Sequence, residues 1–301
     1  MGQDLLRRPP GVLGEPRDYS GNTEGMHVAS VMGDTLRAVG VRATMSGWLS
    51  VQGVQLECLE QGQGRPILWL HGEEGLDPEA PVLDRLATHG HLLAPSHPGF
   101  GHSPEAPSID AVDDLAYLYL DLLAQQDVRD AVVIGCSLGG WIAAEMAVKS
   151  TERVARLVLV APLGIKVGDR ETRDIPDIWA LHPDEVLRLQ YHDPARARLD
   201  HATLSDERLT VIARNREATA LYAWEPYFHD PKLRGRLHRI TVPTLLLWGA
   251  DDRFVAADSY GAAYRDAIPG ARLDTIPGAG HFPHLEQPEA LAERVRAFAL
   301  Q

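Results

Sequence analysis

The sequence predicts an α/β fold: a mostly parallel, doubly wound sheet covered by helices on both faces, with an inserted helical cap. Three observations support this prediction. Short runs that are apolar at every position alternate with amphipathic stretches of helical period. This alternation stops after residue 161 and resumes near residue 240. At 301 residues, 45% of them hydrophobic, the chain is long enough to bury a sizeable core.

The core elements follow from the apolar runs and from the helical spacing between them. Strands are expected at residues 66–70, 91–95, 130–134, 154–160, 242–248 and 271–276. A strand buried on both faces of a parallel sheet forms such a continuous apolar run. Helices are expected at residues 81–88, 110–126, 138–149, 256–267 and 289–300. The core is therefore expected to span residues 46–161 and 240–301.

The interrupting segment, residues 162–239, is too long for a plain connection and contains two helical stretches. Six of the 19 aromatic residues of the chain lie between positions 179 and 228. This segment is predicted to be a helical cap whose rings pack it or line a pocket beneath it. The candidate pocket residues are His71, Trp179, Trp224 and Phe228. Residues 1–45 have weak periodicity and are expected to form an N-terminal extension that is partly disordered.

Composition and charge exclude several classes of protein. The 42 acidic and 29 basic residues give a net charge of -13, which repels phosphate backbones, so no nucleic acid partner is expected. No secretory signal is visible near the N-terminus, and no apolar run approaches the ~20 residues that cross a bilayer. Two cysteines allow at most one disulfide. We expect a soluble, cytoplasmic protein with a small-molecule substrate and no membrane partner; the sequence does not indicate its oligomeric state.

The clearest chemical signal is the pentapeptide Gly-Cys-Ser-Leu-Gly at residues 135–139. It follows an apolar strand and opens a helix, as a nucleophile elbow does. The small residues allow strand and helix to approach closely, and the helix N-terminus faces any negative charge that develops beside the serine. Ser137 is therefore the candidate nucleophile. The alternative is an ordinary glycine-rich turn with a capping serine.

A serine hydroxyl needs a base, and the base needs a carboxylate that orients it. His281 lies in a glycine-containing loop between the strand at 271–276 and the last helix, and His284 is its local competitor. Asp251 and Asp252 directly follow the strand at 242–248, where the loops at strand C-termini collect. Their position alone leaves both carboxylates open. The chain order serine, aspartate, histidine matches that of one hydrolase architecture.

These motifs resemble those of the α/β-hydrolase fold family, in its capped serine-hydrolase branch, over residues 48–301. The resemblance rests on His71-Gly72, the turn at 97–103, the pentapeptide, the stretch 248–252 and Gly280-His281. It implies that the acid is the fifth residue of a Trp-Gly-x-x-Asp pattern, which is Asp252, with Asp251 as the fallback. It also implies an oxyanion hole made by the backbone N–H groups of Glu73 and Leu138. The side chains of Glu73 and Glu74 are expected to be solvated; facing the pocket, they would disfavour anionic substrates.

The expected reaction is hydrolysis of a carboxylic ester of modest size through an acyl-enzyme, by Ser137, His281 and Asp252. No metal or organic cofactor is expected, because nucleophile, base and oxyanion donors all come from the chain. His97 and His102 lack a clear third metal ligand and are expected to be structural or surface residues. A serine at this position argues against the family's dehalogenases and epoxide hydrolases. The open alternatives are a C–C hydrolase of ring-fission diketones, a lactonase, a cofactor-free perhydrolase and, in another class, a non-catalytic ligand-binding protein.

Overall fold

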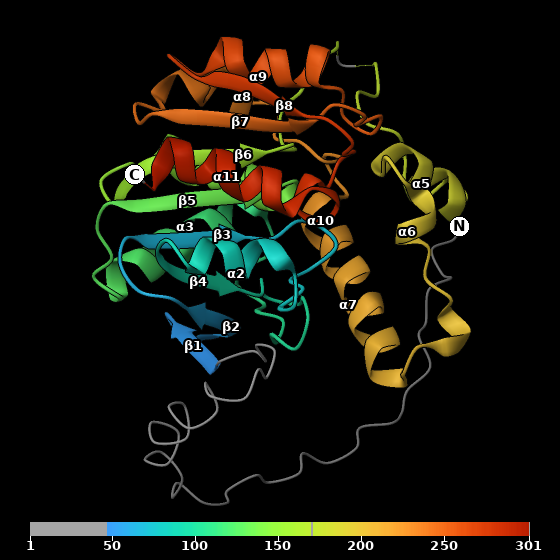
Figure 1. Ribbon diagram of the computed structural model, residues 1–301, viewed down its shortest axis with the longest axis horizontal. Helices are drawn as coiled ribbons and strands as arrows, with labels where there is room; N and C mark the ends of the chain where they lie inside the picture. Colours follow the sequence, from blue (N-terminus) through green and yellow to red (C-terminus); the bar gives the residue numbers. More distant parts are fainter. Residues whose placement is uncertain (1–46, 170, 301) are drawn as a thin grey trace, which may run out of the picture. The chain divides into compact units, whose positions relative to one another are not determined.

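The computed structural model describes residues 47–169 and 171–300, so the extension expected over residues 1–45 lies outside the described part (Figure 1). Within it, eight strands form one sheet in the order β1-β2-β4-β3-β5-β6-β7-β8. The neighbours β1/β2 and β2/β4 are antiparallel, and all the others are parallel. The strands are β1 (Gly47–Val51), β2 (Val54–Gln61), β3 (Pro66–Leu70), β4 (His91–Pro95), β5 (Ala131–Cys136), β6 (Val154–Val160), β7 (Thr244–Gly249) and β8 (Arg272–Ile276). The predicted mostly parallel sheet is confirmed.

The hairpin of β1 and β2 at one edge of the sheet is absent from the sequence prediction. Its first strand alternates between exposed and more buried positions and so lacks the continuous apolar run that marks the central strands. The two residues that join the strands, Gln52 and Gly53, both have positive φ, 49° and 84°, as the tightest hairpin turns require. The sequence signal for such a hairpin is the alternation of exposed and buried positions on either side of a two-residue turn.

Helices cover both faces of the sheet and divide the core into two apolar clusters (Figure 1). The helices α2 and α11 pack against each other on one face, and α3 and α4 pack against each other on the opposite face. The bounds of these core helices are α2 (Pro81–Ala87), α3 (Val112–Gln125), α4 (Leu138–Lys149), η4 (Ala257–Gly261), α9 (Ala262–Ala267), α10 (Pro283–Glu286) and α11 (Pro288–Ala299). No described helix combines the length and the apolar character needed to cross a membrane.

A run of helices, here called the helical insertion, separates β6 from β7. It contains α5 (Pro183–Gln190), α6 (Pro194–Ala197), η2 (His201–Thr203), α7 (Asp206–Ala223), α8 (Leu233–Arg236) and η3 (Leu237–Arg239). The longest, α7, begins where the Ser205 hydroxyl accepts a hydrogen bond from the Arg208 amide. It lies over the loops that follow β3 and β4, because Asn215 donates to the carbonyl of Glu74 and Tyr222 donates to that of Pro98. The insertion therefore covers the C-terminal ends of central strands.

Candidate active site

Ser137 occupies a sharp turn between the end of β5 and the start of α4. Its backbone has φ 48° and ψ -112°, a strained conformation that is uncommon for a residue with a side chain. The turn is possible because its flanking glycines have no Cβ: one added at Gly135 would lie 2.2 Å from the carbonyl oxygen of Gly139. As the first residue of α4, Leu138 has an N–H that no helical carbonyl accepts. The turn therefore has the geometry of a nucleophile elbow.

The structure brings Ser137, His281 and Asp252 into one hydrogen-bonded row. The Ser137 Oγ lies 2.8 Å from Nε2 of His281, and Nδ1 of the same ring lies 2.9 Å from Oδ2 of Asp252. All three residues are buried. Asp252 follows β7, and His281 lies between β8 and α10. Residues separated by 144 and 29 positions along the chain thus meet at the C-terminal edge of the sheet.

The Asp252 carboxylate is held in place by donors on both oxygens. Oδ1 accepts from the amides of Phe254 (2.9 Å) and Val255 (3.0 Å), and Oδ2 accepts from the Trp248 indole at 3.1 Å. By contrast, the neighbouring Asp251 lies at the surface, where its Oδ2 is 2.9 Å from Nδ1 of His192. The geometry therefore separates two carboxylates that their position in the sequence leaves equivalent.

The electrostatics around His281 favour its protonated form. Burial lowers the pKa of this imidazole, but the charge and hydrogen bond of Asp252 and the charges of Glu73 and Glu74 together outweigh burial. The pKa of His281 is therefore raised above its usual value. A base with this bias stabilises the imidazolium that forms when it takes a proton from a neighbouring hydroxyl.

Glu73 and Glu74 were expected to be solvated, and that expectation is wrong. Their side chains are only 9% and 20% exposed. Glu73 Oε1 accepts from the side-chain amide of Gln190 at 3.1 Å and lies 4.0 Å from Nε2 of His281. Glu74 Oε1 lies 3.0 Å from Nε2 of His284, the buried histidine that competes with His281 in the sequence. The helical insertion and α10 enclose this loop, and the sequence around the loop carries no sign of it.

Burial has opposite outcomes for these two carboxyl groups. Burial raises the pKa of Glu73 above its usual value, and the nearby charge of His281 offsets only part of this effect. Burial also acts to raise the pKa of Glu74, but the hydrogen bond and charge of His284, a backbone hydrogen bond and the charge of His71 together outweigh it, so the pKa of Glu74 is lowered. One carboxyl beside the row is therefore biased toward its neutral form, and the next is biased toward the carboxylate.

Two histidines support the loop that carries Glu73. The His71 Nε2 accepts from the amide of His97 at 3.0 Å, and its Nδ1 lies 2.7 Å from the carbonyl oxygen of Gly72. Burial lowers the pKa of His71 to about 4, which keeps this ring neutral. His97 also lies within hydrogen-bonding distance of the Tyr119 hydroxyl, while His102 is exposed. Among the described residues, no cluster of three His, Cys, Asp or Glu side chains is arranged to hold a metal ion.

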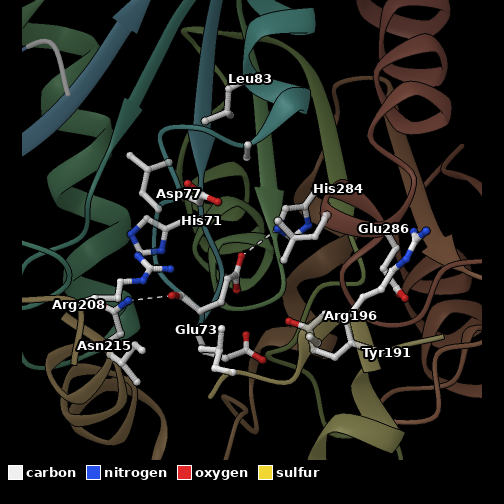
Figure 2. Close-up of a pocket in the computed structure, with 18 of the residues that line it drawn as sticks. His71, Glu73, Asp77, Leu83, Tyr191, Arg196, Arg208, Asn215, His284 and Glu286 are labelled. Carbon is white, nitrogen blue, oxygen red and sulfur yellow. Dashed lines mark hydrogen bonds and ion pairs between the residues drawn. The ribbon is translucent and has the colours of Figure 1, made fainter. Parts of the chain in front are cut away.

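Two cavities adjoin Glu73. The inner cavity, of about 480 Å³, lies between the loop after β3, α7 and α10, and it is lined by His71, Glu73, Glu74 and His284 among others (Figure 2). The outer cavity, of about 780 Å³, lies within the helical insertion and is lined by Glu73, Trp179 and Gln190 among others. Ser137 lines neither of the two, whereas Glu73, whose Oε1 is 4.0 Å from Nε2 of His281, lines both.

The four candidate pocket residues divide into two pairs. His71 lines the inner cavity and Trp179 the outer one. Trp224 lines neither; its side chain is 53% exposed and packs edge-on against Trp179. Phe228 also lines neither cavity and is fully buried, with its ring centroid 6.2 Å from that of Phe254. Clustering along the chain indicated that these rings lie in the insertion but not which way each one faces.

Comparisons with known proteins agree with this architecture. A family model described as the alpha/beta hydrolase family matches residues 67–294. The chain belongs to this family and is an enzyme.

Its relatives include esterases and C–C hydrolases. The pimeloyl-[acyl-carrier protein] methyl ester esterase of Photobacterium profundum is 30% identical over 79% of this chain and 96% of the relative. The 2-hydroxy-6-oxo-6-(2'-aminophenyl)hexa-2,4-dienoic acid hydrolase of Metapseudomonas resinovorans is 27% identical over 85% of this chain and 91% of the relative. The solved structure of a serine hydrolase from Cycloclasticus zankles has the same fold, with a TM-score of 0.67 at 21% identity over 84% of this chain and 96% of the other.

Proposed function

We propose that this chain is a serine hydrolase of carboxylic esters of modest size, with Ser137, His281 and Asp252 as its catalytic triad. The observation that carries the proposal is the unbroken hydrogen-bonded row from the Ser137 hydroxyl through His281 to Asp252, at distances of 2.8 and 2.9 Å. In such a row the serine is activated because the histidine accepts its proton while the carboxylate holds the ring and stabilises the imidazolium.

The steps follow from these positions. Ser137 Oγ attacks the ester carbonyl carbon while His281 Nε2 takes the hydroxyl proton. The N–H groups of Glu73 and Leu138 stabilise the oxyanion, a contribution of about 3 kcal/mol for each donor. His281 then returns the proton to the departing alcohol, and water releases the acyl group by the same route. The insertion over residues 162–239 acts as the lid, with His71 and Trp179 lining the space where substrate binds.

An ester fits this site better than the main alternative, a C–C hydrolase of ring-fission products. The substrate named for the Metapseudomonas relative is a dienoic acid, which carries a carboxylate. The pKa of Glu74 is lowered and its side chain is only 20% exposed, so its charge is weakly screened and repels a carboxylate held beside it. This repulsion favours neutral or cationic esters.

A fluorophosphonate probe tests the nucleophile directly. We expect covalent labelling of the wild-type protein and its loss in Ser137→Ala, because the probe reacts only with an activated serine hydroxyl. Labelling is detected by intact-mass spectrometry, and circular dichroism checks that the variant is folded. Hydrolysis of short-chain nitrophenyl esters, measured beside that of a ring-fission diketone, separates the two candidate activities. A folded wild-type protein that takes up no probe contradicts the proposal.

The pH dependence of kcat/KM tests the electrostatics of the base. His281 must be neutral to accept a proton, so a raised pKa places the acidic limb at a higher pH than an ordinary histidine gives. Because the ionised form of Glu73 helps to raise that pKa, Glu73→Gln is expected to move the acidic limb of the profile to lower pH. Glu293→Gln, an exposed change on α11, is the control and leaves the limb in place. If the acidic limb of the kcat/KM profile stays fixed or moves to higher pH in Glu73→Gln, the Glu73 charge does not raise the pKa of His281.

A further inference from the structure

Three buried polar atoms around the inner cavity have no hydrogen-bond partner within the described part of the chain. They are Oε2 of Glu73, Oε2 of Glu74 and Nδ1 of His284. All three residues line the inner cavity, and the side chains of Glu73 and His284 are only 9% and 4% exposed (Figure 2). Buried polar atoms in folded proteins are nearly always paired. Three unpaired ones around a single cavity indicate a site built for a polar ligand group.

The chemistry of these atoms defines the group that they bind. Each carboxylate is anchored through one oxygen: Glu73 Oε1 accepts from Gln190, and Glu74 Oε1 accepts from Nε2 of His284. This leaves Oε2 of each carboxylate as an acceptor. When a neutral His284 donates its Nε2–H to Glu74, its Nδ1 is also an acceptor. With Glu73 ionised and His284 neutral, all three atoms are acceptors, and the group that satisfies them is one that donates hydrogen bonds.

Charge selects a cationic donor over a neutral one. Glu73 and Glu74 lie in the buried part of the cavity, whereas the three arginines that line it, Arg196, Arg208 and Arg216, are exposed. Exposed cations are screened by water, so the buried end next to the nucleophile keeps its negative character. A cation placed there also favours the ionised form of Glu73, whose pKa burial raises.

The position of Glu73 indicates which half of an ester carries the donor. In the proposed reaction, His281 Nε2 hands its proton to the oxygen of the departing alcohol. Glu73 Oε1 lies 4.0 Å from that nitrogen. A group held by Glu73 is therefore on the alcohol side of the ester, a few bonds from the oxygen that leaves.

We propose that Glu73 and Glu74 form a specificity subsite for a protonated amine on the alcohol half of the substrate, so that the preferred substrates are esters of amino alcohols. This inference rests on the proposed ester hydrolysis and adds the substrate class to it. Glu73 acts here through its side chain, separately from its backbone N–H in the oxyanion hole.

The test compares three acetates at pH 7. Dimethylaminoethyl acetate carries a cationic N–H donor, isopentyl acetate has the same shape without charge, and acetylcholine is cationic but has no N–H. A hydrogen bond between charged groups contributes enough to change kcat/KM about tenfold. We therefore expect the wild type to prefer the amine ester to isopentyl acetate by about tenfold, with acetylcholine below the amine ester. Glu73→Gln brings the ratio of amine ester to isopentyl ester close to one, and the control Glu293→Gln retains the wild-type ratio.

Two results overturn the inference while the proposed function stands: equal wild-type turnover of the amine and isopentyl esters, or acetylcholine turnover equal to that of the amine ester. If no acetate is hydrolysed, the binding of the two alcohols to the protein still tests the subsite. Calorimetry with dimethylaminoethanol and isopentyl alcohol on the Ser137→Ala variant is expected to show binding of the amine alone, lost when Glu73→Gln is added. Absence of amine binding to the single variant counts against the subsite, whatever the protein hydrolyses.

Discussion

Asp252→Asn is expected to lower kcat for ester hydrolysis by about 10⁴-fold while the chain stays folded. The carboxylate fixes the His281 ring through a 2.9 Å contact with Nδ1, and an asparagine there removes the charge that stabilises the imidazolium. The fold survives because an asparagine oxygen still accepts from the amides of Phe254 and Val255, as Oδ1 of Asp252 does. Steady-state kinetics measure the loss, and circular dichroism verifies the fold.

The matched control is the adjacent residue, since Asp251→Asn removes the same charge one position earlier. Asp251 lies at the surface beside His192, and exposed ion pairs of this kind contribute about 0–1 kcal/mol. We expect kcat in this variant to stay within about fivefold of the wild-type value. A larger loss in Asp251→Asn than in Asp252→Asn would falsify the assignment of the acid and return it to the fallback residue.

The parts of the site that the sequence predicted are those fixed by local geometry. The strand, turn and helix around Ser137 are contiguous, so the spacing of Gly135 and Gly139 already indicates how closely the backbones approach. Asp252 follows β7, whose apolar run is easily recognised, and His281 follows β8, a strand of mixed polarity that precedes the glycine-containing loop. Because parallel strands end at the same edge of a sheet, short loops after them bring these side chains near the turn. Their placement needed only strand order and loop length.

The side chain of Glu73 shows what a single sequence leaves undetermined. Its N–H belongs to a loop that the motif locates, but the direction of its carboxyl depends on Gln190, which is 117 positions away in the helical insertion. Likewise Trp224 and Phe228 share one aromatic cluster, yet one is 53% exposed and the other is fully buried. Both residues lie in the turn that follows α7, where long-range packing rather than helical periodicity decides which way a side chain points. The distinctive chemistry of the inner cavity therefore emerges only in the folded chain.

Gly139→Ala is expected to destabilise the protein by about 4 kcal/mol or more, a large fraction of the stability of an ordinary domain. A Cβ at this position would lie 2.1 Å from the carbonyl oxygen of Leu70 and 2.4 Å from that of His71. Both contacts are with backbone, so no side-chain rotation relieves them. The end of β3 must move away from α4, and with it the following loop that carries Glu73.

Gly235→Ala is the matched control: it makes the same chemical change but is not expected to lower the stability. The space around Gly235 in α8 is open, and alanine favours a helix over glycine by about 0.5–1 kcal/mol, so this variant is expected to be as stable as the wild type or slightly more stable. Urea unfolding followed by circular dichroism measures both variants. If Gly139→Ala unfolds at the wild-type urea concentration, the close packing of β3 against α4 is not a requirement of the fold.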